Sequence, residues 1–516
     1  MTSPSARMRA WWTRLRSVDV GLPLMIVAFA FVLRIIPELR GELPGGTDYD
    51  EGVYFATANA LARGIIPYRD FVSVHPPGVP LLLTPIAGPF TSVFGPTAGF
   101  LAARIVAAIA GAVTTFLVYR CAQRLSGTRA AVLASLLYAT FGAAIVAEGR
   151  ILLDPFMIAF AVAGSFVFLE RRGRRAAIVA GTLLGLAVSM KVTGAVFIVG
   201  VLIVGLAVDP TRRRDTLHVV AATTITFALI TLPFAIMAGP GTFVAQVVTA
   251  QVDRPSGAGL PGNISSVTAR FSEIMAWGPL GNRGTLPNLV SICLAVVALS
   301  VVVWGATRRS RRAWFWTVTF TVALIGLSGT PTFYVQYAAL AGAPLAILLG
   351  GSMTSLLSRL SVRSAMISMI LIVVILVGWE VKRAVFTTQI PLTRTQELLY
   401  SEGIKNGCVF TDEPDAAFVS GIIPQDGLRR PLIDPFGELL SLGGKDAATA
   451  LDALHSPQSQ QRLRAALEAC PWVILSVPID EQFLWTEETR ERFVETHALI
   501  IGGTPSAWYL RSDAVQ

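Results

Sequence analysis

The most prominent pattern in the chain is a series of apolar runs separated by short charged connections. A run of about 17–25 apolar residues is long enough to cross a bilayer as an α-helix. The runs before residue 383 therefore predict about eleven transmembrane helices. Their approximate ranges are 20–36, 97–119, 130–147, 153–169, 176–190, 192–208, 216–238, 288–306, 313–328, 337–357 and 365–381.

Basic residues cluster in alternate connections between these runs. Cytoplasmic loops of membrane proteins are enriched in Lys and Arg. With the N-terminal tail, the pattern predicts a cytoplasmic N-terminus, an odd number of spans and a C-terminal segment outside the membrane. The clusters are RCAQRLSGTR (120–129), RRGRR (171–175), RRR (212–214), RRSRR (308–312) and RLSVR (359–363).

Composition supports a polytopic membrane protein. Of the 516 residues, 53% are hydrophobic and 15% are charged, against roughly 25% charged residues in soluble proteins. This excludes a cytosolic enzyme, a disordered tail and a disulfide-rich secreted domain. The net charge is +9, but residues 384–516 contain 10 basic and 18 acidic residues. The basic surplus thus lies in the hydrophobic part, as expected for cytoplasmic loops and not for nucleic-acid binding.

The chain divides into two predicted domains. Residues 1–383 form an all-α transmembrane domain, with outer loops at 38–96 and 239–287. Residues 384–516 form a small extracytoplasmic α/β domain. Within that domain we predict strands at 408–414 and 472–478 and helices at 458–469 and 487–495.

The densest group of carboxylates on the outer side is TDYDEG, residues 47–52. The following VYFATANALAR (53–63) has helical spacing, and we predict a helix at the membrane interface. An ionised Asp50 facing a cavity can act as a general base. Alternatively, Asp50 caps the helix and Glu51 is a favourable first-turn charge. Asp48 and Asp50 could also hold a divalent cation, but we predict no metal or other cofactor.

Several cations lie at the outer ends of the apolar runs, where charge is costly and often functional. They could form a phosphate-binding pocket, because guanidinium groups bind phosphate in a bidentate manner. The alternative is pairing between helices, for instance of Arg150 with Asp154 or Glu148. The cations are Arg34, Arg104, Arg150 and Lys191, joined by Arg63.

Other candidate residues flank the same side. His75 precedes Pro76 and Pro77, which fix an extended chain and give the histidine a defined direction. Tyr334, Gln336 and Tyr337 form a polar and aromatic group, which membrane-interface anchoring explains equally well. Cys408 and Cys470 both begin predicted strands of the outer domain, where a disulfide can form.

Taken in order, these motifs resemble the GT-C superfamily of polytopic glycosyltransferases. The nearest members are bacterial relatives of protein O-mannosyltransferases and of the lipid A aminoarabinose transferase. The resemblance covers roughly residues 18–360 and rests on five motifs. They are DEGVY (50–54), PYRDF with HPPG (67–78), EGRILLDPF (148–156), the lysine at 191 and FYVQYAALAGAPLAILLGG (333–351).

The resemblance implies a multi-pass enzyme of the bacterial plasma membrane. It would transfer a sugar from a polyprenyl-phosphate donor to an acceptor hydroxyl on a cell-envelope glycan, lipid or protein, with inversion. Asp50 would be the general base, Glu51 would position acceptor or sugar, and Tyr54 would bind substrate. His75 stands where aminoarabinose transferases have lysine, so the resemblance does not carry a charged phosphate contact over to His75. Val53 stands where they have arginine, which argues against lipid A as substrate.

Two other classes of protein remain as alternatives. A transporter or lipid flippase would show inverted repeats, broken helices at the membrane midplane and mostly short loops. A non-catalytic membrane assembly factor would leave the ordered motifs without a role. Long outer loops and a carboxylate pair outside the membrane favour the enzyme.

Overall fold

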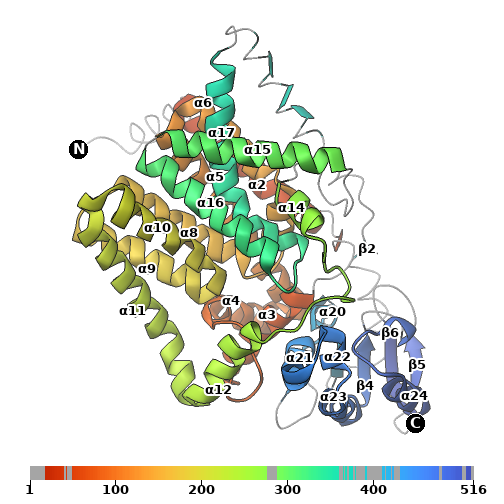
Figure 1. The fold of residues 1–516 in the computed structure, drawn as a ribbon. Helices are drawn as coiled ribbons and strands as arrows, with labels where there is room; N and C mark the ends of the chain where they lie inside the picture. The colour runs from red at the N-terminus through yellow and green to blue at the C-terminus, as the bar shows by residue number, and fades with distance from the viewer. Residues whose placement is uncertain are drawn as a thin grey trace, which may run out of the picture.

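The computed structural model is mostly helical, with a small C-terminal sheet (Figure 1). The described residues are 18–39, 42–43, 49–275, 288–308, 310–359, scattered positions between 364 and 378, 390–391, 409–412, 414–419, 421–423, 431–475, 479–501 and 507–512.

The apolar runs are helices, as predicted. Where a run is long, successive helices are joined by a single glycine or a short basic turn. The predicted run 365–381 lies largely outside the described residues. The helices of the bundle are α2 (Val18–Leu39), α5 (Pro96–Ser126), α6 (Thr128–Ala139), α7 (Gly142–Glu148), α8 (Asp154–Glu170), α9 (Arg174–Met190), α10 (Ala195–Ile203), α11 (Arg213–Ala238), α15 (Asn288–Thr307), α16 (Arg311–Gly329) and α17 (Ala339–Leu357).

Three helices are long and apolar enough to cross a membrane by themselves: Pro96–Ser126, Pro210–Ala238 and Val335–Leu357. The pair α6 and α7 adds a fourth if its 62° bend lies within one span. Other apolar helices, such as Val192–Val208, are shorter. The predicted number of eleven spans therefore stays a prediction.

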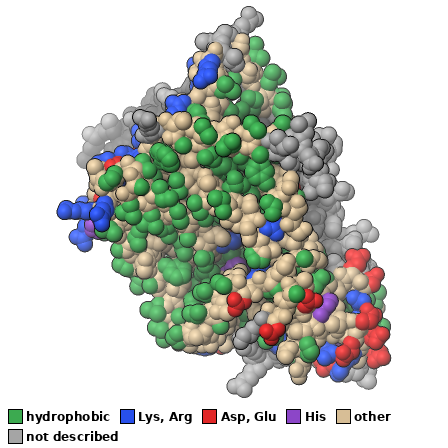
Figure 2. Space-filling model, in the orientation of Figure 1, with side chains coloured by type: hydrophobic (Ala, Val, Ile, Leu, Met, Phe, Trp, Pro, Cys, Tyr) green, Lys and Arg blue, Asp and Glu red, His purple; other side chains and the backbone are tan. Residues whose placement is uncertain are grey.

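Four of the predicted basic loops come together in space, and Arg212 donates to the Arg171 carbonyl between two of them. Asp209 accepts from Arg172 at 3.2 Å and lies 3.8 Å from Arg311. Glu170 binds Arg312 at 2.6 Å and lies 3.6 Å from Arg124. Figure 2 shows a cluster of basic side chains at the left, away from the acidic side chains at the lower right. The loops predicted to share one side of a membrane therefore share one end of the bundle.

The predicted first outer loop contains two helices, α3 (Tyr49–Ala62) and α4 (Gly78–Phe94). The sequence analysis predicts a helix for the first of them, which is confirmed, and its place at the membrane interface stays a prediction. Ten consecutive residues, Glu51 to Ala60, are buried, so α3 is surrounded by protein. It packs against α4 on one side and α20 (Pro414–Val419) of the C-terminal domain on another.

The C-terminal domain is a four-stranded sheet with helices. Its strand order is β3 (Val409–Thr411), β4 (Trp472–Leu475), β6 (Ala507–Arg511), β5 (His497–Ile501). The first pair is parallel and the others are antiparallel. The predicted strands and helices are confirmed as β3, β4, α23 (Pro457–Ala469) and α24 (Glu487–Thr496). The crossover between β3 and β4 includes α20, α21 (Pro435–Gly443) and α22 (Ala450–Leu454), and it faces the bundle (Figure 1).

Small residues bring helices of the bundle close together. In α9, Gly181 and Gly185 lie against the backbone of α11, and Thr223 donates to the Gly181 carbonyl at 3.0 Å. A Cβ at Gly185 would lie 2.7 Å from the Thr223 carbonyl oxygen. Glycines four residues apart permit this close approach between helices in a membrane.

Gly185→Ala should therefore destabilise the bundle. The added methyl group must push α9 and α11 apart, and overpacking of this kind costs about 1–3 kcal/mol. We expect a lower thermal unfolding temperature of the protein in detergent. Gly326→Ala in α16 is the matched control, because a Cβ there meets nothing within 4 Å. Equal melting of the two variants would contradict the close packing of α9 on α11.

Candidate active site

A cavity of about 490 Å³ lies between the helical bundle and the C-terminal domain. Figure 2 shows a hollow on this face, with basic and histidine side chains at its floor and hydrophobic side chains above it. Both domains line the cavity. The polar and charged side chains in its lining are Tyr49, Asp50, Tyr54, His75, Arg150, Gln251, Arg254, Tyr334, Gln336, Tyr337, Asp412, Asp434 and Ser441.

The first turn of α3 separates its two adjacent carboxylates. Asp50 lines the cavity together with Tyr54, one turn further along the helix. Glu51 is fully buried and faces α5, where Arg104 Nε donates to it at 3.0 Å and Arg104 Nη2 makes a second bond. The Ile151 backbone nitrogen also donates to Glu51, at 3.2 Å. The two carboxylates therefore have different surroundings, and Asp50 is the one that faces the cavity.

Glu51 and Arg104 were predicted to contact substrate, but neither is among the described residues that line the cavity. Both are buried and bonded to each other. A buried carboxylate needs such a partner, because leaving it unpaired would cost several kcal/mol. Their role in this structure is to tie α3 to α5.

Other predicted cations are also paired between helices. Lys191 Nζ binds both oxygens of Asp154, at 3.0 and 2.9 Å. Arg34 Nε donates to Glu148 at 2.6 Å, and both side chains are fully buried. Lys191 also lies 4.3 Å from the centre of the Tyr337 ring. The Lys191–Asp154 pair therefore lies next to Tyr337, which lines the cavity, but is not itself among the described lining residues.

Two arginines do line the cavity, Arg150 and Arg254. Arg150 follows α7, as the EGRILLDPF motif indicates. Arg254 is a residue that the sequence analysis missed. Its guanidinium carbon lies 5.8 Å from the Phe436 ring centre, and its Nε is buried without a hydrogen-bond partner among the described residues. In the sequence, Arg254 is marked only by its position before a proline in the second outer loop.

His75 lies at the cavity in a firmly held loop. Its backbone carbonyl accepts from the Tyr68 hydroxyl at 2.5 Å, and its ring makes an edge contact with Tyr54 at 5.8 Å. The adjacent Val74 carbonyl accepts from Gln251 at 2.9 Å. Burial, with the positive charges of Lys191 and Arg254, lowers the pKa of His75 to about 3. His75 is therefore a neutral group, unlike a lysine at this position.

Tyr334, Gln336 and Tyr337 all line the cavity, where α17 begins with a 3₁₀ turn, η6 (Val335–Ala338). The rings of the two tyrosines meet edge to face at 5.7 Å. The second outer loop supports this segment, since Asn263 accepts from the Phe333 nitrogen at 2.9 Å. The motif FYVQY thus contributes side chains to the cavity lining, and their contact with substrate stays a prediction.

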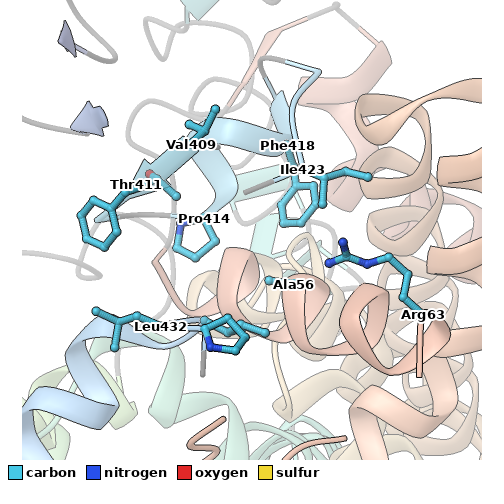
Figure 3. Close-up of a pocket in the computed structure, with 11 residues that line it drawn as sticks. Ala56, Arg63, Val409, Thr411, Pro414, Phe418, Ile423 and Leu432 are labelled. Carbon is cyan, nitrogen blue, oxygen red and sulfur yellow. The ribbon is translucent and has the colours of Figure 1, made fainter. Parts of the chain in front are cut away.

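Arg63 lies elsewhere. It lines a separate cavity of about 30 Å³ between the end of α3 and the C-terminal domain (Figure 3). A space of that size holds a water molecule and no sugar or phosphate ester. Arg63 Nε donates to the Asn59 carbonyl at 3.4 Å. The predicted grouping of Arg63 with the other cations is therefore wrong.

The structure describes only some of the remaining predicted residues. Asp48 and Cys408 lie outside the described residues. Cys470 is disulfide-bonded, whereas Cys121 and Cys293 are free thiols. The pairing of Cys470 with Cys408 stays a prediction. The described part of the chain contains no group of three or more His, Cys, Asp and Glu side chains placed to hold a metal.

The C-terminal domain supplies an acidic wall to the cavity through Asp412 and Asp434, which the sequence analysis missed. Asp434 caps α21 by accepting from the Gly437 nitrogen at 2.8 Å, and it accepts from the Tyr49 hydroxyl at 2.6 Å. Burial raises the pKa of the Asp434 carboxyl, although these hydrogen bonds act in the opposite direction. The cavity is thus lined by arginines and by carboxylates from both domains.

The low pKa of His75 has a direct test by NMR. With its pKa near 3, the imidazole should show constant ring-nitrogen shifts between about pH 5 and 8, where an exposed histidine would titrate. Its signal is identified by its loss in His75→Gln. A titration midpoint inside this pH range would contradict the lowered pKa of His75.

Part of the chain matches a family profile and a known protein. Residues 74–237 match the family profile of dolichyl-phosphate-mannose-protein mannosyltransferases. The chain is 30% identical over 198 residues to the undecaprenyl phosphate-α-4-amino-4-deoxy-L-arabinose arabinosyl transferase of Pseudomonas aeruginosa. That match covers 36% of this chain and 35% of the relative, so it spans about a third of the relative's length.

Two solved structures have a similar fold over nearly the whole chain. ArnT from Cupriavidus metallidurans bound to undecaprenyl phosphate has a TM-score of 0.58 at 15% identity, covering 95% of this chain and 98% of ArnT. The apo oligosaccharyltransferase of Archaeoglobus fulgidus has a TM-score of 0.59 at 13% identity, covering 97% of this chain and 75% of that one. The chain therefore has the fold of the GT-C glycosyltransferases, and the predicted resemblance to this superfamily is confirmed.

Proposed function

We propose that the protein is a membrane glycosyltransferase that moves a sugar from a polyprenyl-phosphate donor to an acceptor hydroxyl, with inversion. The observation that carries the proposal is one cavity lined by a carboxylate, Asp50, and by two guanidinium groups, Arg150 and Arg254. The similarity to proteins whose names include undecaprenyl phosphate supports the class of donor.

In the proposed reaction, the acceptor oxygen attacks the anomeric carbon of the donor sugar. The acceptor O–H proton passes to Asp50, a new glycosidic C–O bond forms, and the bond between the anomeric carbon and the phosphate oxygen breaks. Polyprenyl phosphate leaves with the electron pair of that bond. General-base assistance of this kind contributes about 10²–10⁴-fold to a rate. The proposed step uses protein groups and no metal or cofactor.

Arg254 and Arg150 would bind the phosphate as its negative charge increases. A buried guanidinium with an unsatisfied N–H is a strong donor to such an oxyanion, and preorganised charge in a dry site is effective. His75 would contribute a neutral hydrogen bond, because its pKa of about 3 keeps it unprotonated. The Asp412 carboxylate would accept a hydrogen bond from a hydroxyl group of sugar or acceptor.

The lipid tail has a matching apolar surface beside the cavity. The helical segment 240–252, made of α12 (Pro240–Val244), η4 (Ala245–Thr249) and α13 (Ala250–Val252), lines the cavity with Ala250 and Gln251. Val244, Val248 and Val252 of the same segment are exposed. These side chains support lateral binding of a polyprenyl chain from the membrane.

The orientation in the membrane follows from the two ends of the bundle. The clustered basic loops would lie in the cytoplasm with the N-terminus. The cavity and the acidic C-terminal domain would then lie on the outer face of a bacterial plasma membrane. The acceptor would be a hydroxyl of a cell-envelope glycan, lipid or protein.

Asp50→Asn should abolish transfer while leaving folding intact. The amide cannot take the acceptor proton, so we expect a loss of about 10²–10⁴-fold in rate. The measurement is release of polyprenyl phosphate by the purified protein in detergent, from a panel of polyprenyl-phosphate sugars, with membrane extract as acceptor. Asp70→Asn is the matched control, because Asp70 lies in the same loop and binds Arg69 at 2.7 Å. A fully active Asp50→Asn enzyme would exclude Asp50 as the base, and no release from any donor would favour a transporter or assembly factor.

Arg254→Gln should weaken use of the lipid donor. Loss of a charged hydrogen bond to phosphate costs about 1.5–3 kcal/mol, so we expect the KM for donor to rise about 10–100-fold. The KM for acceptor should change little. Arg69→Gln, an exposed arginine of the first outer loop, is the control. An equal rise in both KM values would place Arg254 outside the phosphate site.

A further inference from the structure

The start of α3 is bonded directly to the C-terminal domain. Tyr49 donates its hydroxyl hydrogen to Asp434 at 2.6 Å, and the same hydroxyl oxygen accepts from the Phe436 nitrogen at 2.7 Å. The Tyr49 ring meets the Phe436 ring edge to face at 6.0 Å. The Tyr49 hydroxyl therefore lies within the first turn of α21, which Asp434 caps.

The same side of α3 follows the C-terminal domain along the helix. A Cβ at Gly52 would lie 2.2 Å from the Asp415 backbone nitrogen, so only glycine fits there. Phe55 meets Phe418 of α20 edge to face at 4.7 Å. Ala56 and Arg63 line the small cavity beside β3 and α20, as Figure 3 shows. The contact is thus a continuous stripe, Tyr49–Gly52–Ala56, at helical spacing.

We propose that the Tyr49–Asp434 hydrogen bond positions the catalytic helix, so that the C-terminal domain sets the direction of Asp50. Tyr49 and Asp434 are positioning residues: they act on the acceptor proton through Asp50. This inference rests on the proposed function of the same cavity and adds a role for the C-terminal domain.

The geometry of α3 explains why one hydrogen bond can have this effect. Consecutive residues of an α-helix point about 100° apart, so Tyr49, Asp50 and Glu51 face three directions. Glu51 is bonded to Arg104 of α5, and Tyr49 is bonded to α21. Asp50 lies between these two attachments and faces the cavity. Release of either attachment lets the first turn rotate, and a small misplacement of a catalytic group is costly.

The test compares Tyr49→Phe, Asp434→Ala and Asp434→Asn in the full-length enzyme. Tyr49→Phe removes the hydroxyl and keeps the ring contact with Phe436. We expect kcat to fall about tenfold, the equivalent of one hydrogen bond, with the KM for donor within about twofold. Asp434→Ala should do the same, whereas Asp434→Asn keeps an oxygen acceptor and should retain most of the activity.

A double variant and a control separate positioning from simple loss of folding. Tyr49→Phe combined with Asp434→Ala should be no slower than the slower single variant, because each single change already removes the same Tyr49–Asp434 hydrogen bond. Glu488→Gln, an exposed residue of the same domain paired with Arg464, should be fully active. Thermal unfolding of each variant is measured in parallel. If Asp434→Ala does not fold, the activity of Tyr49→Phe alone decides the test.

The outcomes distinguish this inference from the proposed function. An inactive Asp50→Asn with a fully active Tyr49→Phe would overturn the positioning role alone. A larger change in the KM for either substrate than in kcat would also overturn it, because it would show direct substrate binding by Tyr49. An active Asp50→Asn would overturn the proposed function itself.

Discussion

The burial of ten consecutive residues of α3, Glu51 to Ala60, is the constraint on which the site depends. A helix that carries two adjacent carboxylates can be enclosed by protein only if each charge has a defined environment. Glu51 meets this requirement by binding Arg104 and the Ile151 nitrogen. Because Glu51 is fixed on α5, its neighbour Asp50 must face the cavity. The ion pair therefore determines which of the two carboxylates faces the cavity.

Pairing also sorts the cations of the bundle. Arg34 and Lys191 are each bonded to a carboxylate, so their charges are largely compensated locally. Arg254 keeps a buried Nε without a hydrogen-bond partner in the described part of the chain, and it lies on an aromatic ring at the cavity. In a low-dielectric region an unsatisfied donor is costly, and binding of an anion relieves that cost. Among the described residues, the positive charge of the cavity lining thus comes from Arg150 and Arg254, and not from the paired cations Arg34 and Lys191.

Local patterns predicted the helices, the basic end of the bundle, the four C-terminal elements and the cavity residues Asp50, His75, Arg150 and Tyr337. These features are recorded in runs, charges and short motifs. The sequence analysis did not predict the burial of α3, because it could not show that a separate domain covers the second side of the helix. Arg254 and Asp434 were missed for a related reason: each reaches the cavity through contacts between distant segments, and neither stands in a charged motif.

The contact between Tyr49 and Asp434 joins residues 385 positions apart, and this has a consequence for biosynthesis. A ribosome completes the bundle helices long before it reaches α21, and domains generally fold in the order in which they emerge. Until α21 has formed, the first turn of α3 lacks one of its two attachments and the cavity lacks its acidic wall. The bundle of a nascent chain would therefore be folded in the membrane but inactive. It would become active only after the last fifth of the chain has been translated.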